Sequence, residues 1–290
     1  MALTVNTNTT SLGVQKNLNR ASDALATSMT RLSSGLKINS AKDDAAGLQI
    51  ATRMTSQIRG QTMAIKNAND GISIAQTAEG AMQEQTNMLQ RMRELAIQAR
   101  NDSNSFKDRD ALNGEFKSML DEINRVAGST ELNGKKLLNG DAKTMTFQVG
   151  SNGGSGNQID ITLSAAVDTS SSGVLSALGS NSSIAMTGSA MAASDYNALF
   201  QNVITGIDDA LQNINTTRAD LGAAQNRLTS TINNLQNINE NAEAARGRVQ
   251  DTDFAAETAQ LTKQQTLQQA STSVLAQANQ LPSAVLKLLG

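Results

Sequence analysis

The sequence of 290 residues contains no cysteine, no histidine and no tryptophan, and it has one tyrosine and one proline. Without cysteine it cannot form a disulfide framework. Without histidine and cysteine it lacks a histidine base, a thiolate nucleophile and a His/Cys metal cluster. It also contains no Walker loop and no strand–GxGxxG–helix unit for a nucleotide. We therefore expect neither an enzyme nor a metal or cofactor site.

Aromatic residues make up only 2% of the chain, which is too little to fill a thick core at this length. Hydrophobic residues total 39% and suit thin seams between helices. The formal net charge of -2 gives no basic surface for nucleic acid. No apolar run of about 18 residues is available to span a membrane. The first residues also lack the pattern of a secretory signal peptide, although export by a route that reads another signal stays open.

Between Ile207 and Val249 an apolar or small residue returns at every seventh position, and a second set follows three residues after each. This spacing is the a and d pattern of a coiled coil, held for about six heptads. Apolar residues on the amino-terminal side also step by four and three, so we expect the two halves to pack together. The expected seam comprises Ile58, Ile65, Ile72, Ile207, Ile214, Leu221, Leu228 and Leu235.

The single proline, Pro282, lies near the carboxyl end, so the long segments before it are free of the strongest helix breaker. We expect one helix from about Thr10 to Gly35 and a second that begins near a Ser40–Asp43 capping box. A third helix is expected to end at Gly128 as a left-handed cap. The stripe of the first helix would be Val14, Leu18, Ala21, Leu25, Met29, Leu32 and Leu36. The second helix would run to about Asn101, and two more would occupy residues 194–248 and the segment after Asp253.

The pattern changes in residues 141–193. Apolar residues alternate with polar ones on both sides of the glycine-rich segment GSNGGSGN, which predicts a β-hairpin. From Ala165 to Ala193 the chain is mostly Ser, Gly, Ala and Thr, so we expect a loose insert with little to bury. The predicted fold is mainly α: a long antiparallel helical hairpin, or coiled-coil bundle, with a small β-hairpin insert.

The segment LQRMRELAIQARN, residues 89–101, is richer in charge than its surroundings. Its residues Leu89, Met92 and Leu95 fall on a packing stripe, whereas Arg91 and Glu94 would point outward. From the residues alone, the simplest interpretation is a charged helix face with intrahelical ion pairs. The pair Asp208–Asp209 is likewise interpreted as a solvated face.

Four segments, taken together, resemble bacterial flagellin. They are SSGLKINSAKDDAAGLQIATRM, LQRMRELAIQARN, DEINRVAGSTELNGKKLLNG and TSVLAQANQLPSAVLKLLG, and they occur in the order of the family. The resemblance covers roughly residues 1–150 and 195–290. It departs from the family's larger members in its middle, because the insert is too short and too poor in apolar residues for a large outer domain.

The resemblance implies a structural subunit that polymerises into the extracellular filament of the bacterial flagellum. Residues 1–40 with 252–290 would form inner-core terminal helices, and residues 41–140 with 194–251 an outer-core helical bundle. Residues 141–193 would form the β-hairpin and a short variable surface insert. The residues implied in self-assembly are Leu18, Leu25, Leu32, Leu267, Val274, Leu281 and Leu288.

The resemblance also implies partners. The chain would leave the cell unfolded through the flagellar type III channel, with an export chaperone on its carboxyl-terminal helix, and would meet filament cap and hook-associated junction proteins. Monomers would be recognised by the host flagellin-sensing Toll-like receptor through Gln90, Arg91, Glu94, Leu95, Gln98 and Glu115. A hook–filament junction protein is the nearest alternative. A type III translocator would need a long apolar segment, which the chain lacks.

Overall fold

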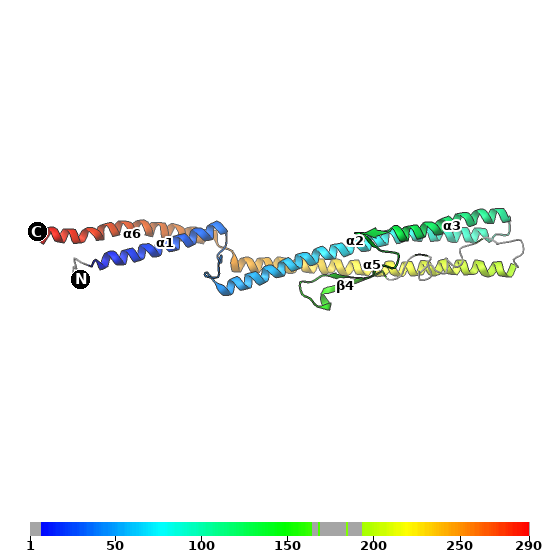
Figure 1. Ribbon diagram of the computed structural model, residues 1–290, viewed down its shortest axis with the longest axis horizontal. Coiled ribbons are helices and arrows are strands. Elements are labelled where there is room, and N and C mark those ends of the chain that lie inside the picture. Colours follow the sequence, from blue (N-terminus) through cyan, green and yellow to red (C-terminus); the bar gives the residue numbers. More distant parts are fainter. Residues whose placement is uncertain (1–6, 164–167, 169–183, 185–192, 290) are drawn as a thin grey trace. The chain divides into compact units, whose positions relative to one another are not determined.

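The computed structural model describes residues 7–163, 168, 184 and 193–289. These residues form α1 (Thr9–Ser34), α2 (Ala45–Ala99), α3 (Phe106–Ser129), β1 (Glu131–Leu132), β2 (Lys135–Lys136), β3 (Lys143–Gln148), β4 (Gln158–Leu163), α5 (Ala193–Gln250) and α6 (Phe254–Leu289). The expected mainly α fold with a small β-hairpin is therefore confirmed (Figure 1). Two compact units make up the chain: unit 1 is residues 1–58 with 240–290, and unit 2 is residues 59–239. In the described part of the chain, no helix combines the length and apolar character that a membrane span requires.

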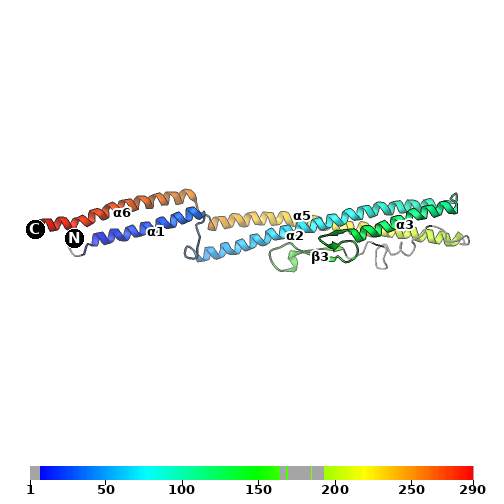
Figure 2. The same cartoon turned by 45° about the horizontal axis from the view of Figure 1, so that its top comes forward.

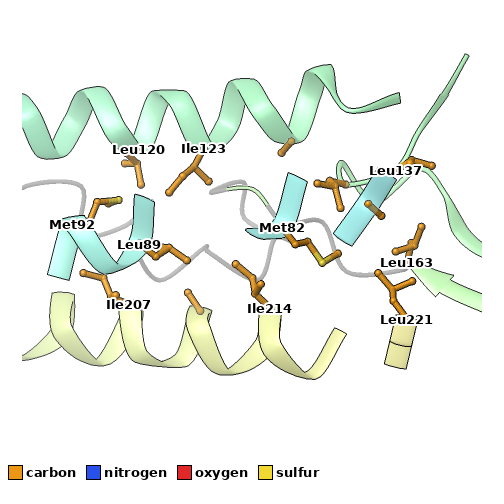
Figure 3. Packing of buried hydrophobic residues seen from close by; sticks show 14 of the residues in the cluster. Met82, Leu89, Met92, Leu120, Ile123, Leu137, Leu163, Ile207, Ile214 and Leu221 are labelled. Atoms are coloured by element: carbon orange, nitrogen blue, oxygen red, sulfur yellow. The ribbon is translucent and has the colours of Figure 1, made fainter. Parts of the chain in front are cut away.

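Unit 2 is built around α2, whose buried side chains recur at steps of four and three. In Figure 3, Met82, Leu89 and Met92 of α2 lie between α3 and α5. From α3 come Leu120 and Ile123, and from α5 come Ile207 and Ile214. The seam residues of α5 are buried, with exposed fractions of 0% for Ile207, 1% for Ile214, 1% for Leu221, 0% for Leu228 and 7% for Leu235. On α2, Ile65 and Ile72 are half-buried, and Ile58, which belongs to unit 1, is 6% exposed.

The β-hairpin packs beside this seam, close to α2 and α5. Strands β3 and β4 are antiparallel, with Met145 opposite Ile161 and Phe147 opposite Ile159. A Cβ added at Gly71 of α2 would stand 3.2 Å from Cδ1 of Leu228 and 3.2 Å from Cγ of Phe147. Glycine at this position thus lets the hairpin and α5 approach α2 closely at the same level. Both views place the hairpin alongside these helices (Figures 1 and 2).

Two of the expected helix boundaries are wrong. Gly128 lies inside α3, and Thr130 ends that helix in an extended conformation, with its N–H and Oγ1 both donating to the Val126 carbonyl oxygen. No left-handed residue is needed there because these two bonds satisfy the terminal carbonyl. The second helix is capped by Asp44, whose Oδ1 accepts the Gly47 N–H at 2.9 Å. Asp43 instead accepts the backbone N–H groups of the preceding turn, which lowers the pKa of its carboxyl group.

The sequence predicts an insert with little to bury, and most of that insert lies outside the described residues. Residue 184, which is described, corrects this expectation. Ile184 is 2% exposed and belongs to the apolar cluster of unit 2. Its backbone N–H donates to Oδ1 of the buried Asn113 on α3 at 2.9 Å. The side chain of Ile184 is therefore part of the core, which the composition of the insert does not reveal.

The seam predicts the effect of a charge at its centre. Leu228→Asp should lower the free energy of unfolding by about 3 kcal/mol or more, because a carboxylate would be buried without a partner. The control is Thr229→Asp, at the exposed neighbouring position, which should change it by about 0.5 kcal/mol or less. Denaturation of both monomers can be followed by circular dichroism. Equal stabilities would show that residue 228 does not face the seam.

The Ile184 contact gives a second prediction. Ile184→Ala should destabilise unit 2 by about 2 kcal/mol or more, because it leaves a cavity against α3. The same truncation at Ile97, which is 50% exposed, serves as the control and should cost much less. Chemical denaturation of the two variants gives the comparison. A stability loss no larger at residue 184 than at residue 97 would mean that Ile184 does not pack in the core.

Candidate interaction surfaces

An exposed polar surface lies where α2 and α3 pair, and we call it the Arg91 surface. It comprises Gln90, Arg91, Glu94 and Gln98 of α2 with Glu115 of α3, all of them exposed. Arg91 joins the two helices: Nε and Nη2 donate to Oε1 of Glu115 at 3.2 and 3.0 Å. Its Nη1 donates to Oε2 of Glu94 at 3.1 Å. The guanidinium is therefore held in one orientation at the surface.

The two glutamates also change the pKa of Arg91. The hydrogen bonds to Glu115, and then to Glu94, raise the pKa of Arg91, so the group is charged at any physiological pH. The side chains of Arg91 and Glu115 remain 46% and 43% exposed. Ion pairs in this setting contribute little to stability because water and salt screen them. The network thus orders the surface without holding the fold together.

Leu95 does not belong to this surface, which corrects the expected receptor-binding set. Its side chain is 0% exposed and lies in the apolar cluster of unit 2 with Met92 and Ile123. The reason is its position three residues after Met92, which places it on the packing stripe of α2. A partner of the folded monomer can contact the other five residues directly, but not Leu95.

Sequence reasoning missed the contacts that tie α2 to α5 next to this surface. Nε of Arg93 donates to Oδ1 of Asp208 at 2.8 Å, so Asp208 is paired and not merely solvated. Further along, the guanidinium of Arg100 lies over the ring of Phe200, 5.0 Å from its centroid. Both pairs join segments one hundred residues or more apart in the sequence, and no local pattern indicates them.

In unit 1, α1 and α6 pair in antiparallel fashion, and polar contacts join them at both ends. Nδ2 of Asn8 donates to the Ala278 carbonyl oxygen at 2.8 Å, and Oγ of Ser11 donates to Oδ1 of Asn279 at 2.8 Å. At the other end of the pair, Arg31 and Glu257 approach to 3.7 Å. The most buried residues of this pairing are Ala21, Ser28 and Ala278, at 5%, 3% and 3% exposure. Leu18, Leu25 and Leu32 are half-buried.

Large apolar side chains of unit 1 point away from this pairing. Leu267 and Val274 of α6 are 44% and 47% exposed, and Leu12 and Met29 of α1 are each 57% exposed. Met29 was expected on the packing stripe of α1, but Ser28 takes that place. Both residues fit a spacing of four and three, so the period alone does not choose between them. Leu281 and Leu288 lie in α6, but their side chains are outside the described part of the chain.

These surfaces can now be set beside known proteins. Residues 5–143 match the bacterial flagellin N-terminal helical region, and residues 204–289 match the bacterial flagellin C-terminal helical region. Flagellin B of Vibrio anguillarum is 42% identical over 376 aligned positions, and flagellin B of Vibrio cholerae is 40% identical over the same number, each alignment covering 100% of both chains. The chain belongs to the bacterial flagellin family. This flagellin is a structural subunit of the extracellular flagellar filament and not an enzyme.

Two further comparisons bear on the chain's architecture. The alignments with the Vibrio flagellins span 376 positions, whereas this chain has 290 residues. The alignments therefore contain gaps in this chain. A putative flagellar hook-associated protein from Vibrio parahaemolyticus shares the fold, with a TM-score of 0.62. That match covers 72% of this chain and 100% of the other chain, at 16% sequence identity. At that identity the likeness concerns the fold alone.

Proposed function

We propose that this flagellin assembles into its filament through the outward apolar residues of α1 and α6. The observation that carries the proposal is the set of exposed apolar side chains on unit 1. Leu12, Met29, Leu267 and Val274 remain exposed, although α1 and α6 pair along their length. Exposed apolar residues along two paired helices are a surface that association would cover. Contacts of this kind between different faces of identical subunits generate open helical filaments.

The family supports a layered filament. Residues 1–40 with 252–290 would form its inner layer, and residues 41–140 with 194–251 the surrounding bundle. Residues 141–193 would face outward. Most helical stability comes from tertiary packing, and this helix pair buries few side chains completely, so the inner layer would gain its full stability only in the polymer. Limited proteolysis that spared both ends of the monomer as well as it spares the bundle would contradict this view.

The remaining partners follow from the family as well. The chain would be exported unfolded through the flagellar type III channel, with an export chaperone on α6, and would meet the filament cap and the hook-associated junction proteins. A cysteine-free chain with thin seams supports this route, because it can refold outside the cell without disulfide chemistry. Secretion that is undiminished in a strain lacking the flagellar export gate would contradict it.

The host flagellin-sensing Toll-like receptor would bind monomers at the Arg91 surface. Arginine is a frequent interface hot spot because its planar guanidinium offers several hydrogen-bond donors. Here Glu115 and Glu94 already hold that group in place, which lowers the ordering cost of binding. Leu95 is left out because its side chain is buried.

The assembly proposal predicts a variant that folds and does not polymerise. Leu267→Glu should leave the monomer's thermal melt nearly unchanged, because residue 267 is 44% exposed, and should abolish growth on filament seeds. The control Gln265→Glu places the same charge at an exposed neighbouring position and should polymerise. Electron microscopy and sedimentation measure both outcomes. Filaments of normal length from Leu267→Glu would refute the assembly surface. If wild-type chains form only a short cap on the seeds, that result would favour a hook–filament junction protein.

The receptor proposal predicts a loss of signalling without a loss of fold. Arg91→Ala should lower receptor signalling by soluble monomer about tenfold, which is the scale of one interface hot spot. Its thermal melt should stay nearly unchanged, because the ion pairs that it removes are exposed. The matched control is Arg125→Ala on α3, which removes an exposed pair with Glu122 of the same kind. Equal signalling by the two well-folded variants would reject the assignment.

A further inference from the structure

The sequence contains four Asn-Gly pairs, which are Asn113–Gly114, Asn133–Gly134, Asn139–Gly140 and Asn152–Gly153. In such a pair the peptide nitrogen of the glycine can attack the asparagine side chain, because glycine has no side chain to block the approach. The asparagine then loses ammonia and becomes an acid. In a folded chain this reaction depends on the freedom of the two reacting groups. It also depends on how well the surroundings stabilise the peptide once its N–H is deprotonated.

Two of the pairs are held against this reaction by their own contacts. Asn113 lies within α3, and its Oδ1 accepts the backbone N–H of Ile184 at 2.9 Å. Asn139 is bonded to Asp141 through both ends of its carboxamide: Nδ2 donates to Oδ2, and Oδ1 accepts the Asp141 N–H at 3.0 Å. Neither carboxamide is free to turn towards the nitrogen of the glycine that follows it.

The third pair, Asn133–Gly134, forms the two-residue turn between β1 and β2. Both residues have positive φ, 51° and 75°, which is the geometry of a tight hairpin turn. The pairing of Leu132 with Lys135 holds the backbone on either side. The carbonyl oxygen of Asn133 accepts no hydrogen bond from the residues that the structure describes. This peptide therefore has no described donor that could stabilise a negative charge.

The fourth pair, Asn152–Gly153, lies in the exposed loop of the β3–β4 hairpin and differs from the other three. The carbonyl oxygen of Asn152 accepts two hydrogen bonds, from Nε2 of Gln148 at 2.9 Å and from the N–H of Gly154 at 3.1 Å. Within the described part of the chain, the Asn152 carboxamide and the Gly153 N–H form no hydrogen bond. A Cβ added at Gly153 would meet nothing within 4 Å. The two reacting groups are thus free, while the oxygen of the peptide that joins them is held by donors.

The side-chain amide of Gln148 is fixed with its nitrogen towards the loop. Besides the Asn152 carbonyl oxygen, Nε2 donates to the Gly150 carbonyl oxygen at 3.0 Å. At the other end of the amide, Oε1 accepts Nε2 of Gln158 at 3.2 Å, across the antiparallel pair of β3 and β4. A donor that is already oriented needs no reorganisation when charge develops on its acceptor.

We propose that Asn152 is a site of spontaneous deamidation, promoted by the donors that Gln148 and Gly154 direct at the Asn152–Gly153 peptide. Loss of the Gly153 N–H proton to hydroxide leaves a negative charge that the peptide nitrogen shares with the Asn152 carbonyl oxygen. The two hydrogen bonds to that oxygen favour the charged form. They also leave the nitrogen free to react.

The reaction needs only water as a co-reactant. The Gly153 nitrogen forms a bond to Cγ of Asn152, the bond from Cγ to Nδ2 breaks, and ammonia leaves with a proton from water, which restores the hydroxide. Water then opens the resulting succinimide at either of its carbonyl groups, which gives aspartate or isoaspartate. One water is consumed and one ammonia is released. The product adds a negative charge to the hairpin loop, and this inference does not depend on filament assembly.

The four pairs of the wild-type chain test the site against one another. The folded, full-length monomer is incubated in slightly alkaline buffer, and peptide mapping with an added isoaspartyl methyltransferase measures each conversion. Asn152 should convert at least tenfold faster than Asn113 and Asn139, and faster than Asn133. In urea the four rates should converge, because the contacts that distinguish them are lost. A rate at Asn152 in the folded monomer no higher than that at Asn139 would overturn the site.

Variants of Gln148 and Gln158 test the role of the donor. Gln148→Met removes Nε2 at similar size and should slow conversion at Asn152 about fivefold, the scale of one hydrogen bond. Gln158→Met keeps the donor but releases its orientation, so it should slow conversion by a smaller factor. Asn133 is the internal control, and its rate should stay unchanged in both variants. If Gln148 only restrained the loop, its removal would speed the reaction. Equal or faster conversion at Asn152 in both variants would therefore overturn the proposed role of the donor.

Discussion

The buried stripe of α2 is the constraint on which unit 2 depends. Along this stripe the side chains change size with the partner that they face. Ala64, Ala68 and Ala75 are at most 2% exposed at the level of the hairpin, where Gly71 also admits Phe147 and Leu228. Met82, Leu89 and Met92 replace them where α3 and α5 are the partners (Figure 3). Small residues allow the hairpin to approach α2 closely, and larger ones fill the space between round helices.

Polar residues interrupt the same stripe and limit how it can slide. Gln85 and Thr86 are 0% and 6% exposed, yet they sit among alanines and methionines. Nε2 of Gln85 donates to the Ile123 carbonyl oxygen of α3 at 3.3 Å. A rotation of α3 that moved this carbonyl away would leave the amide group buried against apolar side chains. Buried polar groups in thin seams favour one register for this reason, as they do in coiled coils.

Much of this architecture can be predicted from the sequence, because long helices with regular seams leave a clear period. The positions of Ile207, Ile214 and Leu228 follow from the heptad alone. The period does not tell which of two adjacent residues a close helix pair selects, as the exchange of Met29 for Ser28 shows. Contacts set by tertiary packing leave no local signal either. Neither the pairing of Asp208 nor the burial of Ile184 could be derived from the neighbours of those residues in the chain.

The two units bury their apolar side chains in different ways. Unit 2 packs the large apolar side chains of its seam against one another within one chain. In unit 1 the most buried side chains of the helix pair are Ala21, Ser28 and Ala278, and Leu18, Leu25 and Leu32 are half-buried. Leu12, Met29, Leu267 and Val274 remain exposed. Burial of those outward side chains against neighbouring subunits would add to the free energy of the internal pairing, since the gain scales with the apolar area removed from water. In the assembly proposed above, polymerisation would therefore stabilise the helix pair of unit 1 as well.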